Sequence, residues 1–152
     1  MPKASVKRLI HCQKKDLINL VLDIEKYPQF VPFCYDAKIY ENKKEGDLRK
    51  IIADLTIGKG PFKDTYKSDV VFDKKNDSIY VKNIDGPLNH LSNNWNFTEE
   101  KNGITEVTFD IDFEIKNKFL NSLMVVSFQF GLEKIADAFQ KRAEELFNSS
   151  KN

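Results

Sequence analysis

The chain has 152 residues, 41% of them hydrophobic, which is enough to bury the core of one globular domain. Its 24 Lys and Arg residues nearly balance 23 Asp and Glu residues, so the net charge of +1 argues against the basic field of a DNA-binding protein. We expect a single domain over residues 1–147, a disordered polar tail over residues 148–152, and no DNA partner.

The sequence carries no recognisable targeting or membrane-spanning segment. Residues 1–12 lack the apolar core of a signal peptide, and no run of eighteen apolar residues free of charge is present. Cys12 and Cys34 form no CxxC pair and have no clustered histidines beside them, which predicts neither a zinc site nor a redox motif. We expect a cytoplasmic protein with free thiols and without a metal or cofactor.

The first third of the chain switches from strand to helix. Residues 4–11 predict a short strand, and residues 14–24 carry apolar side chains at helical spacing. Pro28 is compatible with the first turn of a second short helix, and Pro32 closes that turn. Residues 27–34 should therefore form a compact, aromatic elbow after two short helices.

From residue 36 onward the hydrophobic period is two. It predicts strands over residues 36–40, 48–57, 63–72, 78–84, 89–98 and 104–115, separated by turn signals. The last strand alternates apolar and polar side chains without error, so one of its faces should be buried. We expect Asp110 and Asp112 to be exposed to solvent, and an inward-facing set made of Trp95, Phe97, Val107, Phe109, Ile111 and Phe113.

Residues 118–147 predict one long helix, because apolar side chains recur every three or four residues. Its first half is more apolar than one packed face requires, which indicates a core contact, a dimer seam, a ligand-lining helix or a membrane-touching helix. Gly131 separates the halves, where a kink or a close backbone approach is easiest. We expect Leu120, Met124 and Phe128 to line a cavity, and a second face to touch a membrane or a partner subunit: Phe119, Leu123, Val126 and Phe130.

The order of elements predicts an α+β domain in which a curved antiparallel sheet wraps the terminal helix. Signals for catalysis are weak, since His11 and His90 lie near no nucleophile motif and no Gly-rich phosphate loop is present. We therefore expect no catalytic residues and no enzyme. Asn83 and Asn93 fall on the inward register, where an amide is either satisfied within the core or a polar anchor of an apolar cavity.

A set of short segments carries a family signature. They are Tyr27-Pro28-Gln29-Phe30-Val31-Pro32-Phe33-Cys34, Ala53-Asp54-Leu55, Asp85-Gly86-Pro87-Leu88-Asn89-His90-Leu91 with Trp95 and Phe97, Asp112-Phe113-Glu114, and Ala138-Phe139-Gln140-Lys141-Arg142-Ala143. The YPxFxPxC elbow followed by DGPxxHL resembles the coenzyme Q-binding protein/RatA family of the polyketide cyclase/START (helix-grip) superfamily. The chain departs from that family at Gln29, Phe33 and Leu88, where Glu, Trp and Phe are common.

The resemblance implies a helix-grip fold, in which a seven-stranded antiparallel sheet grips the C-terminal helix around an apolar tunnel. It implies non-enzymatic binding and delivery of ubiquinone, or a related isoprenoid lipid, in support of bacterial respiratory electron transport. The alternative is a RatA-type toxin that binds the ribosome and blocks subunit association, and a further alternative is a cyclase- or dehydratase-like enzyme. The resemblance also leaves open whether the protein contacts the inner membrane peripherally.

Two prolines should hold the aromatic elbow rigid at a cavity mouth, with little entropy lost on binding. A quinone headgroup needs one or two polar partners, for which Tyr66, Asn93 and His90 are the candidates. The expected ligand-binding set is Tyr27, Phe30, Val31, Phe33, Leu55, Phe62, Tyr66, Asn93, Trp95, Phe109, Leu120, Met124 and Phe128.

Overall fold

The computed structural model describes residues 3–59, 61–86 and 88–147, without the side chains of residues 59, 62, 88, 115, 120, 121 and 123–128. The elements in chain order are β1 (Lys3–Ile10), α1 (Lys14–Leu22), the 3₁₀ helix η1 (Ile24–Gln29), β2 (Cys34–Glu45), β3 (Leu48–Lys59), β4 (Phe62–Asp73), β5 (Ser78–Asp85), β6 (Leu88–Lys101), β7 (Ile104–Ile115) and α2 (Lys118–Phe147). The predicted order of elements is confirmed.

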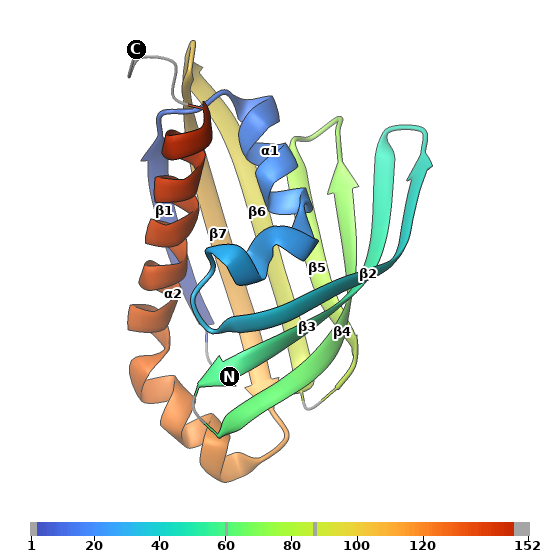
Figure 1. Cartoon of the computed structure of the whole chain (residues 1–152), viewed down its shortest axis with the longest axis vertical. Coiled ribbons are helices and arrows are strands. Elements are labelled where there is room, and N and C mark those ends of the chain that lie inside the picture. The colour runs from blue at the N-terminus through green and yellow to red at the C-terminus, as the bar shows by residue number, and fades with distance from the viewer. Residues whose placement is uncertain (1–2, 60, 87, 148–152) are drawn as a thin grey trace.

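All seven strands form one antiparallel sheet in the order β1-β7-β6-β5-β4-β3-β2. The first strand thus pairs with the last, and β2 forms the opposite edge. The sheet is strongly curved, and α1, η1 and α2 all lie on its concave side (Figure 1). This is the expected α+β arrangement, with the long helix held against the sheet.

Most element bounds agree with the periodicity to within about two residues; the ends of β2 and β6 and the start of the second helix differ more. The strand β2 runs to Glu45 because residues 41–45, although polar and exposed on both faces, pair with β3 across a tight turn. The second helix begins at Ile24 rather than at Pro28, so Pro28 lies near its end. A 3₁₀ helix this short tolerates the proline, since few backbone donors are lost.

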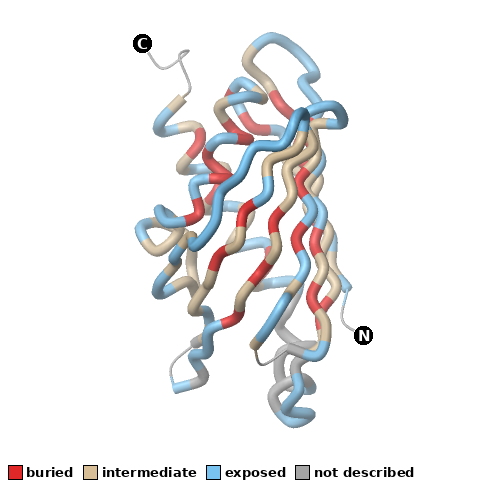
Figure 2. The backbone as a smooth tube through the Cα atoms, turned by 90° about the vertical axis from the view of Figure 1, so that its right-hand side faces the viewer, coloured by how far each residue is buried: buried red, intermediate tan, exposed pale blue. Residues whose placement is uncertain are grey.

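The predicted inward register of β6 and β7 is confirmed. Trp95 pairs with Phe109 and Phe97 with Val107, while Phe97, Val107 and Phe113 are buried. Figure 2 shows the same alternation, with buried positions recurring along each central strand. In the described part of the chain, no helix has both the length and the apolarity that crossing a bilayer requires.

The expectation that Asp110 and Asp112 are exposed was wrong in degree. Both lie on the outer face, but each is only partly exposed, because β1 pairs alongside β7 and shields them. The Ser5 hydroxyl donates to Asp110 Oδ1 at 2.5 Å, and His90 Nε2 lies 3.7 Å from Asp112 Oδ2. Alternation in the sequence identified the face, whereas the neighbouring strand determined the exposure.

The free edge of β1 is covered by α2. The side-chain amides of Gln129 and Gln140 donate to the carbonyl oxygens of Ser5 and Leu9, at 3.3 and 3.2 Å. Backbone groups at a sheet edge otherwise invite pairing with another chain. The helix therefore closes one side of the sheet as well as covering its concave face.

Candidate functional site

The concave face of the sheet is divided into two apolar clusters. The main core joins the sheet to α1, η1 and the C-terminal half of α2, and includes Leu17, Ile51, Ile79 and Phe139. The second cluster consists of Tyr66, Leu91 and Phe113, with the partly buried Leu55 and Ile111 packed against it. Leu55 contacts both clusters, so the second continues the apolar face beyond the main core.

Most of the predicted elbow residues belong to the main core. The rings of Tyr27 and Phe30 meet Phe139 edge to face, with centroids 5.4 and 5.2 Å apart, and Val31 packs against the same cluster. The Tyr27 hydroxyl donates to the Val21 carbonyl, and burial raises the pKa of this hydroxyl. These contacts attach the elbow to the C-terminal half of α2.

Trp95 packs against the main core, and Phe109 packs against Trp95. Their ring centroids are 4.3 Å apart, and Trp95 meets Phe139 at 5.2 Å. Together they border an apolar cavity of about 20 Å³. A space of that size holds about one water molecule, so these residues fill the core in this conformation rather than line an open tunnel.

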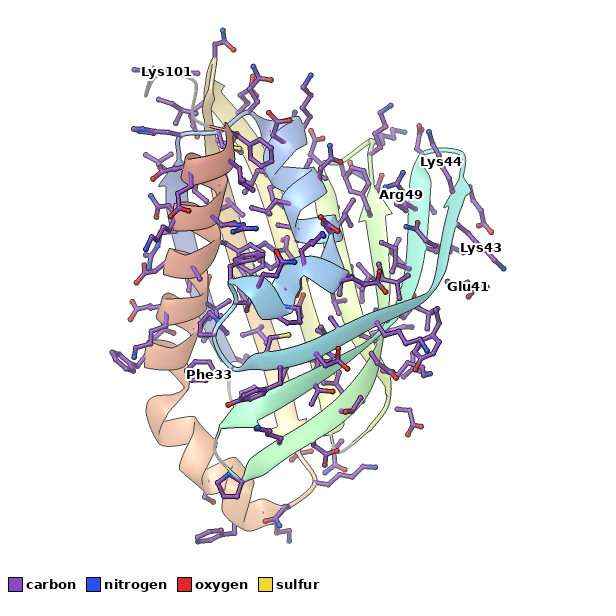
Figure 3. All side chains as sticks on the ribbon, viewed as in Figure 1. Phe33, Glu41, Lys43, Lys44, Arg49 and Lys101 are labelled. Atoms are coloured by element: carbon purple, nitrogen blue, oxygen red, sulfur yellow. The ribbon has the colours of Figure 1, made fainter. Side chains whose placement is uncertain are left out.

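Phe33 differs from the rest of the elbow. Its backbone φ is +67°, a left-handed conformation that is unusual for a residue other than glycine. A Cβ placed at Gly131 would lie 3.8 Å from Phe33 Cε2, so the ring rests against α2 at the boundary between its halves. Figure 3 shows Phe33 next to the helix, and the helix axis changes direction in this region (Figure 1).

Tyr66 is the buried polar member of the second cluster, with 8% of its surface exposed. Its position depends on Gly86, whose φ is +134° and where a Cβ would approach Tyr66 Cβ to 2.7 Å. Only glycine fits there, which gives the DGP segment a structural role beside Tyr66. Burial, and then the nearby Cys34, raise the pKa of the Tyr66 hydroxyl, so it remains a proton donor at neutral pH.

The predicted polar candidates occupy different environments. Asn93 lies on the concave face, 9% exposed, and no described residue hydrogen-bonds its buried Oδ1 atom. His90 lies on the outer face beside Asp112, so it cannot reach the interior, and the prediction that it serves a headgroup was wrong. A register shift between Leu88 and His90 separates this side chain from the inward set.

Four predicted site residues have side chains outside the described part of the structure: Phe62, Leu120, Met124 and Phe128. Three residues that sequence reasoning did not include in the site, Leu91, Ile111 and Phe113, form the second cluster with Tyr66. Their inward register was visible in the sequence. Which of the inward residues lie outside the main core was not, because alternation identifies a face and not a position along the helix that covers it.

A family model described as polyketide cyclase/dehydrase and lipid transport matches residues 15–140. The chain is 34% identical to the ribosome association toxin RatA of Rickettsia prowazekii, over 91% of this chain and 94% of that protein. It is 33% identical to the mitochondrial coenzyme Q-binding protein COQ10 of Dictyostelium discoideum, over 87% of this chain and 64% of that protein.

Solved structures agree with this relationship. An 18 kDa protein from Caulobacter crescentus is 26% identical with a TM-score of 0.79, covering 96% of this chain and 98% of that one. The Zhui aromatase/cyclase from Streptomyces, at 13% identity, shares only the fold, with a TM-score of 0.78 and coverage of 94% and 93%. The chain therefore belongs to the polyketide cyclase/dehydrase and lipid transport family, in the branch that contains RatA and COQ10.

Proposed function

We propose that this protein binds ubiquinone or a related isoprenoid lipid and delivers it without transforming it. The observation that carries the proposal is the second cluster, a group of buried apolar side chains on the concave face that is separate from the main core. Lipid sites combine such apolar walls with a few polar groups, here Tyr66 and Asn93. The similarity to a coenzyme Q-binding protein supports the same ligand class.

Protonation states support binding rather than chemistry. Burial raises the pKa of the Cys34 thiol to about 11 and that of the Cys12 thiol to about 12, so neither is a thiolate nucleophile at neutral pH. The Tyr66 pKa is also raised, which makes its hydroxyl a poor general base. These groups suit hydrogen bonding to a ligand and not proton abstraction from it.

The proposal includes peripheral contact with the inner membrane, because an isoprenoid ligand resides in the bilayer. The protein would approach the membrane from the cytoplasmic side. Phe119 and Phe130 support it, because both side chains are exposed and project from α2. Lys116 and Lys118 are exposed at the start of the same helix and would meet anionic headgroups.

Native mass spectrometry and organic extraction of protein purified without detergent test the proposal. A co-purifying isoprenoid quinone is the expected result. A matched pair of variants then locates the ligand: Phe113 in the second cluster and Phe97 in the main core are buried alike, at 5% and 4% exposure. Each Phe→Leu change should cost about 1 kcal/mol of unfolding free energy.

Of the two variants, Phe113→Leu should lower quinone occupancy, and Phe97→Leu should leave it near that of the wild type. Equal occupancy in both variants would place the ligand elsewhere. Protein that carries no isoprenoid, and takes none up from added ubiquinone, would exclude the proposed function.

Ribosome association is the second candidate, and a charged end of the molecule favours it. Lys43, Lys44 and Arg49 belong to the β2–β3 hairpin, which projects from the sheet in Figure 3. The β4–β5 turn lies next to it, because Lys74 N donates to the Asp47 carbonyl at 2.9 Å. The two turns carry six basic side chains, including Lys50 and Lys75, against five acidic ones: Glu41, Glu45, Asp47, Asp73 and Asp77. Asp77 is already paired with Lys14, which lies outside the two turns, at 2.9 Å.

A local excess of positive charge suits a ribosomal RNA surface, and such binding weakens steeply with salt. Co-sedimentation with ribosomal subunits should show binding at low salt that a Lys43→Glu, Lys44→Glu, Lys74→Glu variant loses. The control is a Lys38→Glu, Lys63→Glu, Lys67→Glu variant. It changes the net charge by the same amount, but on the outer face of the sheet. Equal sedimentation of both variants would exclude this surface.

A further inference from the structure

Asn93 lies in the middle of an apolar surface. It follows Leu91 on the concave face of β6 and precedes Trp95, and its cross-strand neighbours are Val81 on β5 and Ile111 on β7. Its side chain is nine-tenths buried. Replacing the amide with leucine would therefore extend the apolar wall without interruption.

Three other polar side chains on this face are hydrogen-bonded. Asn83 Oδ1 accepts from the Leu91 backbone N–H at 2.9 Å, at the point where the β5–β6 pairing ends. Ser68 Oγ donates to the Ala53 carbonyl at 3.3 Å, and Thr105 Oγ1 donates to the Cys12 carbonyl at 2.7 Å. Each of these side chains therefore bonds a backbone group.

Asn93 does not follow this pattern. Within the described part of the chain, its Oδ1 is buried and accepts no hydrogen bond. A buried acceptor without a donor opposes folding, and native proteins keep such groups only rarely. The exception therefore indicates that another molecule supplies a hydrogen-bond partner for this amide when the site is occupied.

The surroundings restrict what that molecule is. Leu91, two residues before Asn93 on the same face of β6, belongs with Tyr66 to the second cluster, so an amide and a phenolic hydroxyl adjoin the same group of apolar side chains. The Asn93 side chain presents a carbonyl oxygen or, after rotation of the amide, an NH₂ group, and can thus pair with a hydroxyl or with a carbonyl. The ligand must therefore offer an oxygen atom to the amide and apolar groups to the surrounding side chains. A ring that carries both oxygen atoms and an apolar tail meets these two requirements.

We propose that Asn93 is the polar anchor of the site, which selects an isoprenoid with an oxygen-bearing ring over a hydrocarbon of the same shape. The inference rests on the proposed function and adds the group that determines specificity. Apolar contacts to Leu91, Ile111 and Phe113 supply affinity for either kind of ligand, whereas Asn93 distinguishes them.

The test compares decylubiquinone with decylbenzene, which keeps the tail and a ring but has no ring oxygen. Displacement of the apolar fluorophore diphenylhexatriene gives the affinity of each. In wild-type protein decylubiquinone should bind more tightly, and Asn93→Leu should reduce the ratio of the two affinities about five- to tenfold, which corresponds to one hydrogen bond of about 1–1.4 kcal/mol. The same change should raise the thermal midpoint by about 2–4 °C, because it removes an unpaired buried acceptor.

Asn83→Leu is the matched control, since this amide also lies on the concave face but already bonds the Leu91 N–H. It should lower the thermal midpoint and leave the affinity ratio unchanged. An unchanged ratio in Asn93→Leu, or a thermal midpoint lower than that of the wild type, would overturn the inference. Wild-type protein that binds neither ligand would instead refute the proposed function, so the two failures are distinguishable.

Discussion

The backbone at Gly86 passes so close to Tyr66 that no side chain fits between them. A Cβ there would lie 2.7 Å from Tyr66 Cβ and 2.8 Å from its Cα, and the φ of +134° is one that only glycine adopts readily. The turn between β5 and β6 thus fixes where Tyr66 stands in the second cluster. The DGP segment serves the site through this contact and not through a polar side chain.

Gly86→Ala should therefore destabilise the protein by about 3 kcal/mol or more, since strain and a backbone clash add together. Gly46→Ala is the matched control, because Gly46 also has a positive φ, +61°, but has no neighbour within 4 Å of a Cβ. It should cost about 1 kcal/mol. Urea unfolding of both variants measures the difference, and equal losses would show that the contact with Tyr66 is unimportant.

The two thiols give the protein a specific response to alkaline pH. Burial raises the pKa of Cys34 from 9.0 to about 11, so the folded state keeps a proton that the unfolded chain loses earlier. This contribution to stability is complete below pH 9 and is lost as the pH rises through about 11. Cys12 acts in the same direction, with a pKa of about 12.

In a series of urea titrations from pH 8 to pH 11, wild-type protein should lose unfolding free energy above pH 9. Cys34→Ala should lose less over the same interval, because one of the groups responsible is gone. Curves of the same steepness for both proteins would mean that Cys34 titrates normally in the folded state.

At the scale of elements, the elbow between η1 and β2 connects the sheet to both halves of α2. Phe30 meets Phe139 in the C-terminal half, whereas Phe33 rests against Gly131 at the boundary. The Phe33 carbonyl also accepts a hydrogen bond from Gly58 N at 3.0 Å, which ties the elbow to the end of β3. One short segment therefore holds the bend in the helix against the rim of the sheet.

The two elbow phenylalanines should respond differently to truncation. Phe30→Ala should cost about 3–5 kcal/mol of unfolding free energy, as a core substitution does. Phe33→Gly should be about 1 kcal/mol more stable than Phe33→Ala, because glycine relieves the left-handed backbone that alanine must keep. Urea unfolding of the three variants checks both statements. If Phe33→Ala were as stable as Phe33→Gly, the backbone at this position would be unstrained.

Sequence periodicity predicted the elements that bury one regular face, because packing imposes the periodic pattern on them. The bounds of β7 and α2 agree with the pattern because each buries one regular face, whereas the polar end of β2 was missed because only backbone pairing holds it. The site was less accessible to the same reasoning. Asn93 was placed on the correct face, but Tyr27, Phe30 and Trp95 turned out to lie in the main core, since alternation does not tell which part of a long helix covers a residue.

At the scale of the whole molecule, two exposed aromatic side chains mark one side of α2. Phe119 and Phe130 are 70% and 63% exposed, and eleven residues of helix bring them to within roughly 20° of the same direction. This confirms the expected outward orientation of these two residues, while Leu123 and Val126 have side chains outside the described part. Large exposed apolar groups beside Lys116 and Lys118 suit contact with an anionic bilayer.

Liposome co-sedimentation tests this surface. Vesicles with anionic lipid should bind wild-type protein, and a Phe119→Ser, Phe130→Ser variant should bind several-fold more weakly without loss of thermal stability. Tyr80→Ser removes an aromatic ring that is 42% exposed on the outer face of β5, and should partition like the wild type. Membrane binding that survives in the double variant would direct attention to another face.

Several described side chains of α2 hold the helix against β1 and the residue that follows it. In the C-terminal half, Gln140 bonds the Leu9 carbonyl, Asp137 accepts from Arg8 at 2.9 Å and Glu144 accepts from His11 N at 3.1 Å. Nearer the bend, Gln129 bonds the Ser5 carbonyl. The Gln129 contact protects the edge of β1 near Ser5, because it occupies a backbone carbonyl that another strand could otherwise pair with. Loss of this single contact, as in Gln129→Ala, should therefore make the protein more prone to self-association through β1.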